Sequence, residues 1–372
     1  MRLLLTGGGT AGHINPALAI AETVLQNDPG AVIEFVGVRN GKEADLVPRE
    51  GYKLHFVRSM GIRRSLSPSN FKAIYLALTS PRAPETQKIL DDFQPDLVIG
   101  TGGFASWPIM KAAADRGIPT AVHESNAKVG LTVKVLQGRV DRIWLNFPQS
   151  IRQLSRSARK RAACVGNPLR AGFGSLPQAE AKRRLGLGED EQLLLAFGGS
   201  LGAEEVNRAV LDMMKKTAGK YPKLTQILAS GKRDYEKMKV LFDKAELPAR
   251  CRLVDYIYEM PLYMSAADLV ISRAGAMTLS ELSRMRKAAV LIPSPNVTDN
   301  HQFKNAKALA DESAAVLVEE KEFACGTLTK AVDRLLADGT EREKLRTQIA
   351  AFSQQDANRL IWEEIQRMTQ KS

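Results

Sequence analysis

LLLTGGGTAGH, residues 3–13, decides the fold of the first half of the chain, and LLLAFGGSLG, residues 193–202, decides that of the second. In each stretch a short apolar run leads directly into glycines, which is typical of a buried parallel strand that turns into a helix. Such a turn points free backbone N–H groups and the positive end of a helix dipole at whatever lies above it. Because the unit occurs twice, we expect two doubly wound, Rossmann-like α/β domains that face a cleft, with a diphosphate-bearing ligand between them.

The length and composition limit the class of protein. With 372 residues, 44% of them hydrophobic, the chain is ordinary for a soluble protein and long enough for about two domains. Its formal net charge of +12 favours an anionic partner: nucleic acid, an acidic membrane surface or a phosphorylated substrate. Cys164, Cys251 and Cys325 form no Cys-x-x-Cys pair, so we expect a reducing cytosol, no disulfide framework and no zinc site. No apolar run approaches the roughly 20 residues of a spanning helix, so we expect a protein that is neither exported nor membrane-spanning.

Strand-like runs alternate with helix-like segments in both halves, which is the rhythm of β/α units around a mostly parallel sheet. The first strand is expected to end at Thr6, and the helix after it to begin near His13 or Ile14. A Gly-Asn-Pro turn at residues 166–168 precedes a stretch rich in glycine, proline and charge, which marks a domain junction. A final helical segment could pack on either half.

The glycines Gly7, Gly9 and Gly12 also satisfy the dinucleotide pattern G-x-G-x-x-G. That interpretation needs an acidic residue at the end of the second strand, to hold a ribose hydroxyl. The second strand is instead followed by Arg39, and Glu34 lies inside the strand rather than at its end. We therefore favour a diphosphate sugar or lipid over a nicotinamide dinucleotide, and a purely structural glycine turn is less favoured than either.

Two polar groups are candidates for acid–base chemistry in the first half. His13 follows the last glycine at the first turn of the helix, where the dipole disfavours protonation and leaves an imidazole able to accept a proton. The alternative is a histidine that merely caps the helix. The run HESN, residues 123–126, ends a strand and suits sugar hydroxyls or abstraction of a hydroxyl proton, although such polar ends often just cap the next helix.

The second half contains a more specific motif in residues 272–281, SRAGAMTLSE. It places a glycine turn and a helix start before Glu281, so the helix N–H groups can hold a nucleotide's diphosphate while the carboxylate accepts the two ribose hydroxyls. A capping arrangement with Glu281 facing solvent is the alternative. The loop at residues 299–302 follows a later strand and is equally compatible with an ordinary polar loop.

Basic residues gather in two clusters of the first half. The first cluster is Arg58, Arg63, Arg64, Lys72, Arg82 and Lys88, and the second is Arg139, Arg142, Arg152, Arg156, Arg159, Lys160 and Arg161. The first surrounds FKAIYLAL, residues 71–78, which fits an interfacial segment among anionic lipid headgroups. A core helix with solvated basic neighbours fits equally well. Nucleic acid is less favoured, because aromatic interleaving and recognition motifs are absent.

Taken together and in order, the motifs resemble a known enzyme family. They are GGTAGH at 8–13 with Asn15-Pro16, GGF at 102–104, HESN at 123–126, GNPLR at 166–170, GGSLG at 198–202, RAGAMTLSE at 273–281, and His301-Gln302 with Asn305-Ala306. They resemble the MurG family, the UDP-N-acetylglucosamine:N-acetylmuramyl-(pentapeptide) pyrophosphoryl-undecaprenol N-acetylglucosamine transferases of peptidoglycan synthesis. The resemblance implies the glycosyltransferase-B fold, in which the final helix crosses back to the first domain. The expected domains are therefore residues 1–166 with the helix 350–372, for acceptor and membrane, and residues 167–349, for UDP-GlcNAc.

The resemblance also implies the site residues. Those expected to bind UDP-GlcNAc are Thr10, Ala11, Gly12, Asn126, Arg170, Ser200, Ile257, Ala276, Met277, Thr278, Leu279, Ser280, Glu281 and Gln302, with Arg170 and Ile257 at the uracil. Gly8, Gly9, Gly102 and Gly103 are expected to receive the acceptor's diphosphate. The chain departs from the family at Ser125, where Gln is usual, and in VGLTV, residues 129–133, where Pro-Gly-Leu-Thr-Asn is usual.

The expected reaction is a single displacement that inverts the anomeric carbon of UDP-GlcNAc, with the C4 hydroxyl of the lipid-linked muramyl sugar as the nucleophile. His13 is the first candidate for the general base and Glu124 the second. No Asp-x-Asp follows an apolar run, so no metal and no other cofactor is expected. The expected location is the cytoplasmic face of the cell membrane, with peripheral attachment. A nicotinamide-dependent reductase and a non-catalytic phosphoglycan-binding module are the alternatives from other classes.

Overall fold

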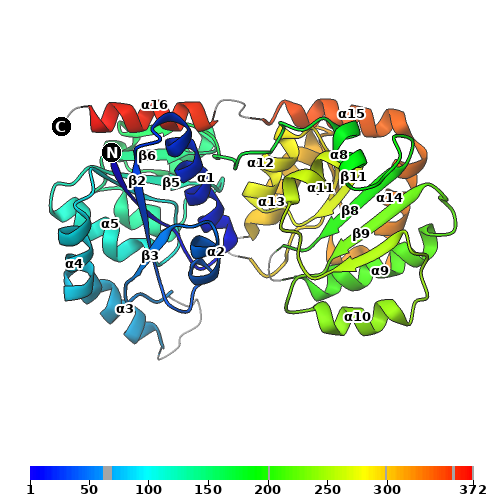
Figure 1. Cartoon of the computed structure of the whole chain (residues 1–372), viewed down its shortest axis with the longest axis horizontal. Coiled ribbons are helices and arrows are strands. Elements are labelled where there is room, and N and C mark those ends of the chain that lie inside the picture. Colours follow the sequence, from blue (N-terminus) through cyan, green and yellow to red (C-terminus); the bar gives the residue numbers. More distant parts are fainter. Residues whose placement is uncertain (62–68, 200–201, 298–299, 354–356, 371–372) are drawn as a thin grey trace. The chain divides into compact units, whose positions relative to one another are not determined.

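The computed structural model describes residues 1–61, 69–199, 202–297, 300–353 and 357–370. The chain divides into two compact units (Figure 1). Unit 1 consists of Met1–Ala171 and Gln354–Ser372, and unit 2 of Gly172–Ser353. These ranges differ by a few residues from the expected domains, 1–166 with 350–372 and 167–349.

Unit 1 is built on a parallel sheet with the strand order β3-β2-β1-β4-β5-β6-β7. The strands are β1 (Arg2–Thr6), β2 (Val32–Gly37), β3 (Lys53–Phe56), β4 (Leu97–Gly100), β5 (Thr120–Glu124), β6 (Arg142–Leu145) and β7 (Ala162–Cys164). The apolar runs of β1 and β4 are fully buried, as expected for central strands that helices cover on both faces. The order reverses between β1 and β4, and such a point is where doubly wound sheets bind ligands.

The helices of unit 1 connect these strands. They are α1 (Ala11–Asn27), α2 (Glu43–Arg49), α3 (Ser69–Thr79), α4 (Pro84–Phe93), α5 (Ser106–Asp115), α6 (Leu131–Leu136), α7 (Arg156–Arg159) and α16 (Ala357–Thr369), with the 3₁₀ turns η1 (Ser80–Arg82) and η2 (Pro148–Gln153). The expectation that the first helix begins near His13 or Ile14 is wrong, because α1 begins at Ala11. Thr10 is the N-cap, and its carbonyl already accepts the N–H groups of His13 and Ile14 at 3.0 and 3.2 Å.

The last helix, α16, belongs to unit 1 and lies against α1 (Figure 1). Ile361 and Ile365 are fully buried in the same apolar cluster as Ile14 of α1. The side-chain amide of Asn358 accepts from the N–H of Leu169 at 3.0 Å and donates to its carbonyl at 2.9 Å. These two bonds hold the end of the first long segment of unit 1 against the returning helix.

Unit 2 repeats the architecture with a six-stranded parallel sheet in the order β10-β9-β8-β11-β12-β13. Its strands are β8 (Gln192–Phe197), β9 (Leu224–Ala229), β10 (Cys251–Val254), β11 (Leu269–Ser272), β12 (Ala288–Leu291) and β13 (Val316–Leu317). Its helices are α8 (Gln178–Arg184), α9 (Glu204–Thr217), α10 (Tyr235–Asp243), α11 (Met260–Ala266), α12 (Ala276–Arg284), α13 (His301–Asp311), α14 (Thr327–Ala337) and α15 (Gly339–Ala350), with the 3₁₀ turn η4 (Glu320–Cys325). The predicted class, two doubly wound α/β units, is confirmed.

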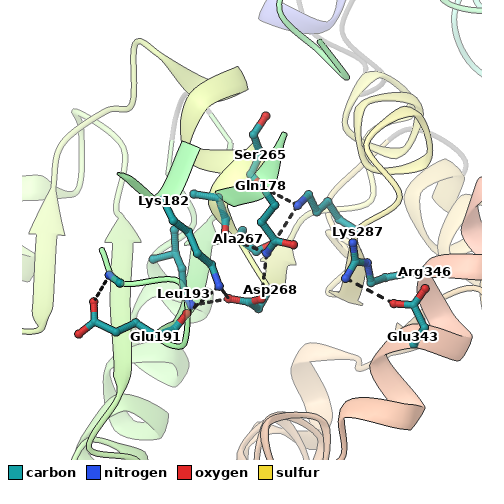
Figure 2. A network of polar contacts seen from close by, with 12 residues as sticks. Gln178, Lys182, Glu191, Leu193, Ser265, Ala267, Asp268, Lys287, Glu343 and Arg346 are labelled. Carbon is teal, nitrogen blue, oxygen red and sulfur yellow. Dashed lines mark hydrogen bonds and ion pairs between the residues drawn. The ribbon is translucent and has the colours of Figure 1, made fainter. Parts of the chain in front are cut away.

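A buried lysine joins the elements at the amino-terminal edge of this second sheet (Figure 2). Lys287, at the start of β12, is 4% exposed and donates from Nζ to the carbonyls of Ser265 and Ala267 at 2.7 and 2.9 Å. These carbonyls lie at the end of α11, where helical C=O groups lack intrahelical donors. Burial lowers the pKa of Lys287 to about 7, and the positive charge of Arg346 on α15 adds to this effect.

Asp268 is the second centre of the same network (Figure 2). Its carboxylate accepts from the backbone N–H of Leu193 at 2.8 Å and from the side-chain amide of Gln178 at 2.9 Å. The Nζ atom of Lys182 lies 3.0 Å from the same carboxylate. The network therefore ties α8 to the starts of β8 and β11.

Replacing Lys287 by Met should change how the stability of unit 2 depends on pH. The pKa of Lys287 lies near 7 in the folded chain and its ordinary value is 10.5, so between these values the unfolded chain binds more protons. The free energy of unfolding of the wild type should therefore rise with pH above about 7, by up to ~1 kcal/mol per pH unit. The K287M variant should lack this rise.

Urea denaturation at several pH values measures this difference through far-UV circular dichroism. Tryptophan fluorescence reports unit 1 separately, since Trp107, Trp144 and Trp362 all lie there. The exposed Lys239 of α10 supplies the control, because K239M should retain the wild-type slope. Equal slopes for K287M and the wild type would contradict the prediction.

Candidate functional site

The two glycine turns of unit 1 interlock where the strand order reverses. The turn after β1 contains Gly8, and the turn after β4 contains Gly102 and Gly103. The N–H of Gly8 donates to the carbonyl of Gly102 at 3.3 Å. A Cβ atom on Gly103 would lie 2.2 Å from the carbonyl oxygen of Gly8, and one on Gly102 would lie 2.9 Å from Cδ2 of His13. Only glycine allows the two turns and the imidazole to approach so closely.

The N–H groups of Gly8 and Gly9 both donate to protein acceptors in this structure, and contact of these two glycines with a diphosphate stays a prediction. The N–H of Gly8 is held by Gly102, and the N–H of Gly9 donates to Oε2 of Glu43 at 3.0 Å. The remaining donors are the first amides of α1, which have no intrahelical acceptor, and those of Gly102 and Gly103. Within the described ranges, the N–H groups of Gly102 and Gly103 donate to no protein atom.

His13 lies in the first turn of α1 with its imidazole beside the interlocked turns. Its Nδ1 atom is 3.1 Å from the carbonyl oxygen of Gly8 and 3.3 Å from Oγ1 of Thr10. A carbonyl oxygen can only accept, so Nδ1 carries the proton and the lone pair is on Nε2. The hydroxyl of Thr101 donates to the backbone carbonyl of His13 at 2.6 Å and fixes the backbone of the same turn.

The HESN run, residues 123–126, begins within β5 and consists of groups already engaged within unit 1. His123 is fully buried and donates from Nε2 to the carbonyl of Gly166 at 2.9 Å, and burial lowers its pKa to about 4. Glu124 accepts from the backbone and side-chain amides of Asn126 at 3.0 and 3.1 Å and from the N–H of Gly130 at 2.7 Å. These contacts make His123 and Glu124 supports of the loop, and they favour His13 as the group able to exchange a proton.

In unit 2 the SRAGAMTLSE motif follows β11 and forms the start of α12, with Gly275 as the N-cap. Ala276, Met277 and Leu279 are buried, whereas Thr278 and Ser280 are partly exposed. The hydroxyl of Ser280 donates to the carbonyl of Ala276 at 3.1 Å. The positive end of this helix therefore lies at the carboxyl edge of the sheet, where an anion is stabilised.

Glu281 projects from the second turn of α12 and keeps part of its surface accessible. Its carboxyl group has no hydrogen-bond partner among the residues that the structure describes. Burial raises the pKa of Glu281 to about 8. A carboxyl group that is removed from water without a protein partner is available to a ligand with hydroxyl groups.

Other expected donor residues also lie at the carboxyl edge of this sheet. Gln302, at the start of α13, accepts from the N–H of Ser294 at 2.9 Å through Oε1, which leaves its NH₂ group able to donate. Ile257 is buried in the loop that follows β10. Ser200 lies outside the described residues. Within the described ranges, no group of three or more His, Cys, Asp or Glu side chains is arranged to hold a metal ion.

The structure locates Arg170 in unit 1, where two carboxylates hold it. Its Nε atom donates to Glu22 at 2.7 Å, and its Nη1 and Nη2 atoms donate to Glu50 at 2.8 and 2.6 Å. Two carboxylates therefore hold the guanidinium of Arg170, and its contact with the uracil stays a prediction.

Sequence reasoning missed two acidic residues next to the expected sites. Glu43 is fully buried beneath the first glycine turn, and Glu320 of η4 lies 2.5 Å from Nη2 of Arg273 at the end of β11. Gly37 and Gly41 both precede Glu43 in the sequence, but glycines in these positions do not by themselves indicate its contact with the distant Gly9. A Cβ atom on either glycine would lie within 2.4 Å of the Glu43 side chain.

The helix α3 presents an apolar face to solvent. Phe71, Tyr75 and Leu78 are 79%, 65% and 73% exposed, and Ile74 is half exposed between them. Their spacing places them on one side of the helix. Of the first basic cluster, Arg58 pairs with Glu85, whereas Arg63 and Arg64 lie outside the described residues. No helix in the part of the chain that the structure describes has the length and apolar character to cross a membrane.

The second basic cluster is largely engaged within unit 1. Arg142 pairs with Glu364 of α16 at 3.4 Å, and Arg139 lies 3.5 Å from Asp115. Arg161 donates to backbone carbonyls of the preceding loop. These contacts give Arg139, Arg142 and Arg161 a structural role, whereas Arg152, Arg156 and Lys160 are exposed.

Comparison with known proteins identifies the family of the chain. Residues 3–145 match the glycosyltransferase family 28 N-terminal domain, and residues 193–361 match the glycosyltransferase family 28 C-terminal domain. The chain is 37% identical over 371 residues to the UDP-N-acetylglucosamine–N-acetylmuramyl-(pentapeptide) pyrophosphoryl-undecaprenol N-acetylglucosamine transferase of Thermoanaerobacter sp. (strain X514), covering 99% of this chain and 100% of that protein. It is 39% identical over 351 residues to the enzyme of the same name from Exiguobacterium sibiricum, covering 92% and 93%.

A solved structure agrees with this assignment. The crystal structure of Acinetobacter baumannii MurG superposes with a TM-score of 0.72 at 26% identity, covering 98% of this chain and 99% of that one. The chain therefore belongs to glycosyltransferase family 28 and, within it, to the MurG family of N-acetylglucosamine transferases.

Proposed function

We propose that this chain transfers GlcNAc from UDP-GlcNAc to the C4 hydroxyl of the muramyl sugar of undecaprenyl-pyrophosphoryl-MurNAc-pentapeptide, with inversion to a β-1,4 bond. Membership of the family supports this reaction, since the relatives are named as these transferases. The observation that supports the donor half is the carboxyl group of Glu281, which has no partner among the described residues. It lies in the second turn of a helix whose positive end faces the carboxyl edge of the unit 2 sheet.

Unit 2 binds the donor in this proposal. The start of α12 stabilises the diphosphate and, as the bond to the sugar breaks, the negative charge that builds on the departing UDP. Glu281 accepts the two ribose hydroxyls, and the NH₂ group of Gln302 donates to the sugar. Backbone groups of Ile257 bind the uracil, and Ser200 remains a predicted diphosphate ligand.

Unit 1 binds the acceptor and supplies the base. The amides at the start of α1 and those of Gly102 and Gly103 bind the acceptor's diphosphate. Nε2 of His13 takes the proton of the C4 hydroxyl as its oxygen bonds to the anomeric carbon. The bond from that carbon to the β-phosphate oxygen breaks, and UDP leaves with the electron pair.

The exposed face of α3 attaches unit 1 to the cytoplasmic face of the membrane that carries the acceptor. Phe71, Tyr75 and Leu78 enter the interfacial layer, while the neighbouring Lys72 meets anionic headgroups. This attachment is peripheral, and it holds the enzyme where a polyprenyl-linked substrate is confined.

Incubation with UDP-GlcNAc and a short-chain pyrophosphoryl muramyl-peptide acceptor tests the reaction. UDP release should depend on the acceptor, and the product should contain one added GlcNAc. Replacing His13 by Ala should lower kcat by roughly 100-fold or more, because general base catalysis typically contributes that much. The affinity for UDP, measured by calorimetry, should stay within about twofold of the wild type.

Two outcomes would contradict the proposal. UDP release without the acceptor, or binding without any product, would exclude the transferase and favour a hydrolase or a binding module. Unchanged turnover in the H13A variant would exclude His13 as the base. The control is Asn15, a partly exposed residue of α1 that follows shortly after His13. The N15A variant should keep kcat near the wild-type value.

The affinity for UDP-GlcNAc should rise with pH because of Glu281. The pKa of this carboxyl group is about 8 in the free protein, and its ionised form accepts both ribose hydroxyls, so binding favours loss of the proton. Between pH 6 and 8 the affinity should increase, by up to ~10-fold per pH unit, and then level off. The E281Q variant should bind more weakly and without this pH dependence.

Isothermal titration calorimetry in buffers of different ionisation enthalpy measures both the affinity and the proton release. The exposed Glu205 of α9 supplies a matched control, and E205Q should behave as the wild type. A wild-type affinity that is flat between pH 6 and 8 would rule out this contact to the ribose.

Replacing Phe71 and Leu78 by Ser should weaken attachment to membranes. Each side chain is largely exposed and would lose roughly 1 kcal/mol or more of apolar transfer, so the double variant should bind vesicles about 10- to 100-fold more weakly. Sedimentation with vesicles that contain anionic phospholipid measures the effect. Turnover of a water-soluble acceptor should be unchanged, and V240S, at an isolated exposed position on α10, should bind vesicles normally. Undiminished vesicle binding by the double variant would exclude α3 as the attachment surface.

A further inference from the structure

Glu43 and His13 are connected through a single peptide group in the first glycine turn. The N–H of Gly9 donates to Oε2 of Glu43 at 3.0 Å, and the carbonyl of Gly8 accepts from Nδ1 of His13 at 3.1 Å. These two polar groups belong to the same peptide unit, because the carbonyl of Gly8 is bonded to the nitrogen of Gly9. A trans peptide is planar and its N–H and C=O point in opposite directions. Fixing one end of this unit therefore fixes the direction of the other.

The carboxylate of Glu43 is itself held firmly. It is fully buried at the start of α2, and its second oxygen, Oε1, accepts the N–H of Val38 at 3.0 Å. A Cβ atom on Gly37 would lie 2.4 Å from Cγ of Glu43, and one on Gly41 would lie 2.3 Å from its carboxylate. The side chain thus occupies a slot that only glycine backbone can form, with each oxygen bound to a different amide.

The Gly8–Gly9 peptide, which lies between Glu43 and His13, is held at both its N–H and its carbonyl group. Gly9 has a φ of +83°, in the region that glycine adopts readily, so the turn takes this orientation without strain. On the other side, the absent Cβ of Gly103 leaves room for the carbonyl oxygen of Gly8, which would be 2.2 Å away from it. The carboxylate, the peptide and the imidazole therefore form one continuous hydrogen-bonded row.

We infer that Glu43 is a positioning residue for His13, acting through the Gly8–Gly9 peptide. The carboxylate orients the peptide so that the carbonyl of Gly8 takes the proton of Nδ1, which leaves the lone pair on Nε2. A hydrogen bond to a charged acceptor on the N–H side also strengthens the carbonyl as an acceptor. The row does for His13 what a directly bonded carboxylate does for the histidine of a catalytic triad, with a peptide group inserted between them.

This inference rests on the proposed function only for the role of His13 as base. The tautomer of His13 is a property of the protein alone and can be measured without any substrate. The experiment below therefore separates a failure of the positioning role from a failure of the proposed reaction.

Nuclear magnetic resonance of the full-length chain labelled with ¹⁵N-histidine reads the tautomer directly. The chain has four histidines, so the His13 signals are identified by their loss in H13Q. In the wild type at neutral pH, Nδ1 should be protonated and Nε2 unprotonated. In E43L, which removes both acceptors, the Nδ1–H form should no longer dominate, and E43Q should be intermediate because one amide keeps an acceptor.

Kinetics then distinguish positioning from general damage to the fold. In E43Q, kcat should fall by roughly 10-fold, a part of the contribution of a general base, while KM for UDP-GlcNAc stays within about twofold. The matched control is Asp45 on the same helix, which is exposed and lies 2.9 Å from Arg49, and D45N should retain the wild-type tautomer and kcat. A kcat of E43Q equal to that of the wild type would overturn the inference.

If the variants fail to fold, measurements on the wild type alone test the positioning role of Glu43. Its Gly9 amide should be protected from hydrogen exchange, because the N–H is donated to a buried carboxylate. A His13 with its proton on Nε2, or a Gly9 amide that exchanges as fast as an exposed loop, would overturn the inference. So would an unchanged His13 tautomer in folded E43L. Wild-type protein with the expected tautomer but no acceptor-dependent UDP release would instead contradict the proposed function.

Discussion

The close approach of backbone to backbone at the reversal of the unit 1 sheet is the constraint on which its site depends. Parallel strands deliver the turns after β1 and β4 to the same edge, and Gly8 and Gly103 pass each other with no room for a Cβ atom. The N–H of Gly8 closes onto the carbonyl of Gly102, so the two turns form one surface. His13 rests on this surface because α1 begins directly behind it. Any side chain at these glycines would push the imidazole and the helix start apart.

In both units an acidic side chain lies close to the glycine turn after the first strand. In unit 1 this is Glu43, bound to the N–H of Gly9. In unit 2, a Cβ atom on Gly202 would lie 2.7 Å from Oδ2 of Asp234, which is 4% exposed. Glycine turns of this kind are usually described as open to an anion. In unit 1, the amides of Gly8 and Gly9 are already satisfied by the protein, so the start of α1 and the amides of Gly102 and Gly103 are the donors left to a ligand.

Local patterns in the sequence predicted the sheets, the glycine turns and the position of Glu281, because each depends on residues close together in the chain. The apolar runs before residues 7 and 198 became β1 and β8, and the SRAGAMTLSE motif became the start of α12. The contacts that the sequence did not predict are those between residues far apart in the chain. Glu43 is 34 residues from Gly9, and Arg170 is 148 residues from Glu22, so no local pattern indicated either contact. The start of α1 was expected near His13 or Ile14, whereas the cap at Thr10 makes the helix begin at Ala11.

The return of α16 to unit 1 has a consequence for biosynthesis. Unit 2 is formed by one uninterrupted segment, whereas unit 1 lacks a helix of its core until residues 357–369 have been translated. Ile14 and its apolar neighbours on α1 are therefore not covered by Ile361 and Ile365 until after unit 2 has been synthesised. Removal of residues 357–369 would therefore uncover the apolar face of α1, in the unit whose first residues are translated earliest.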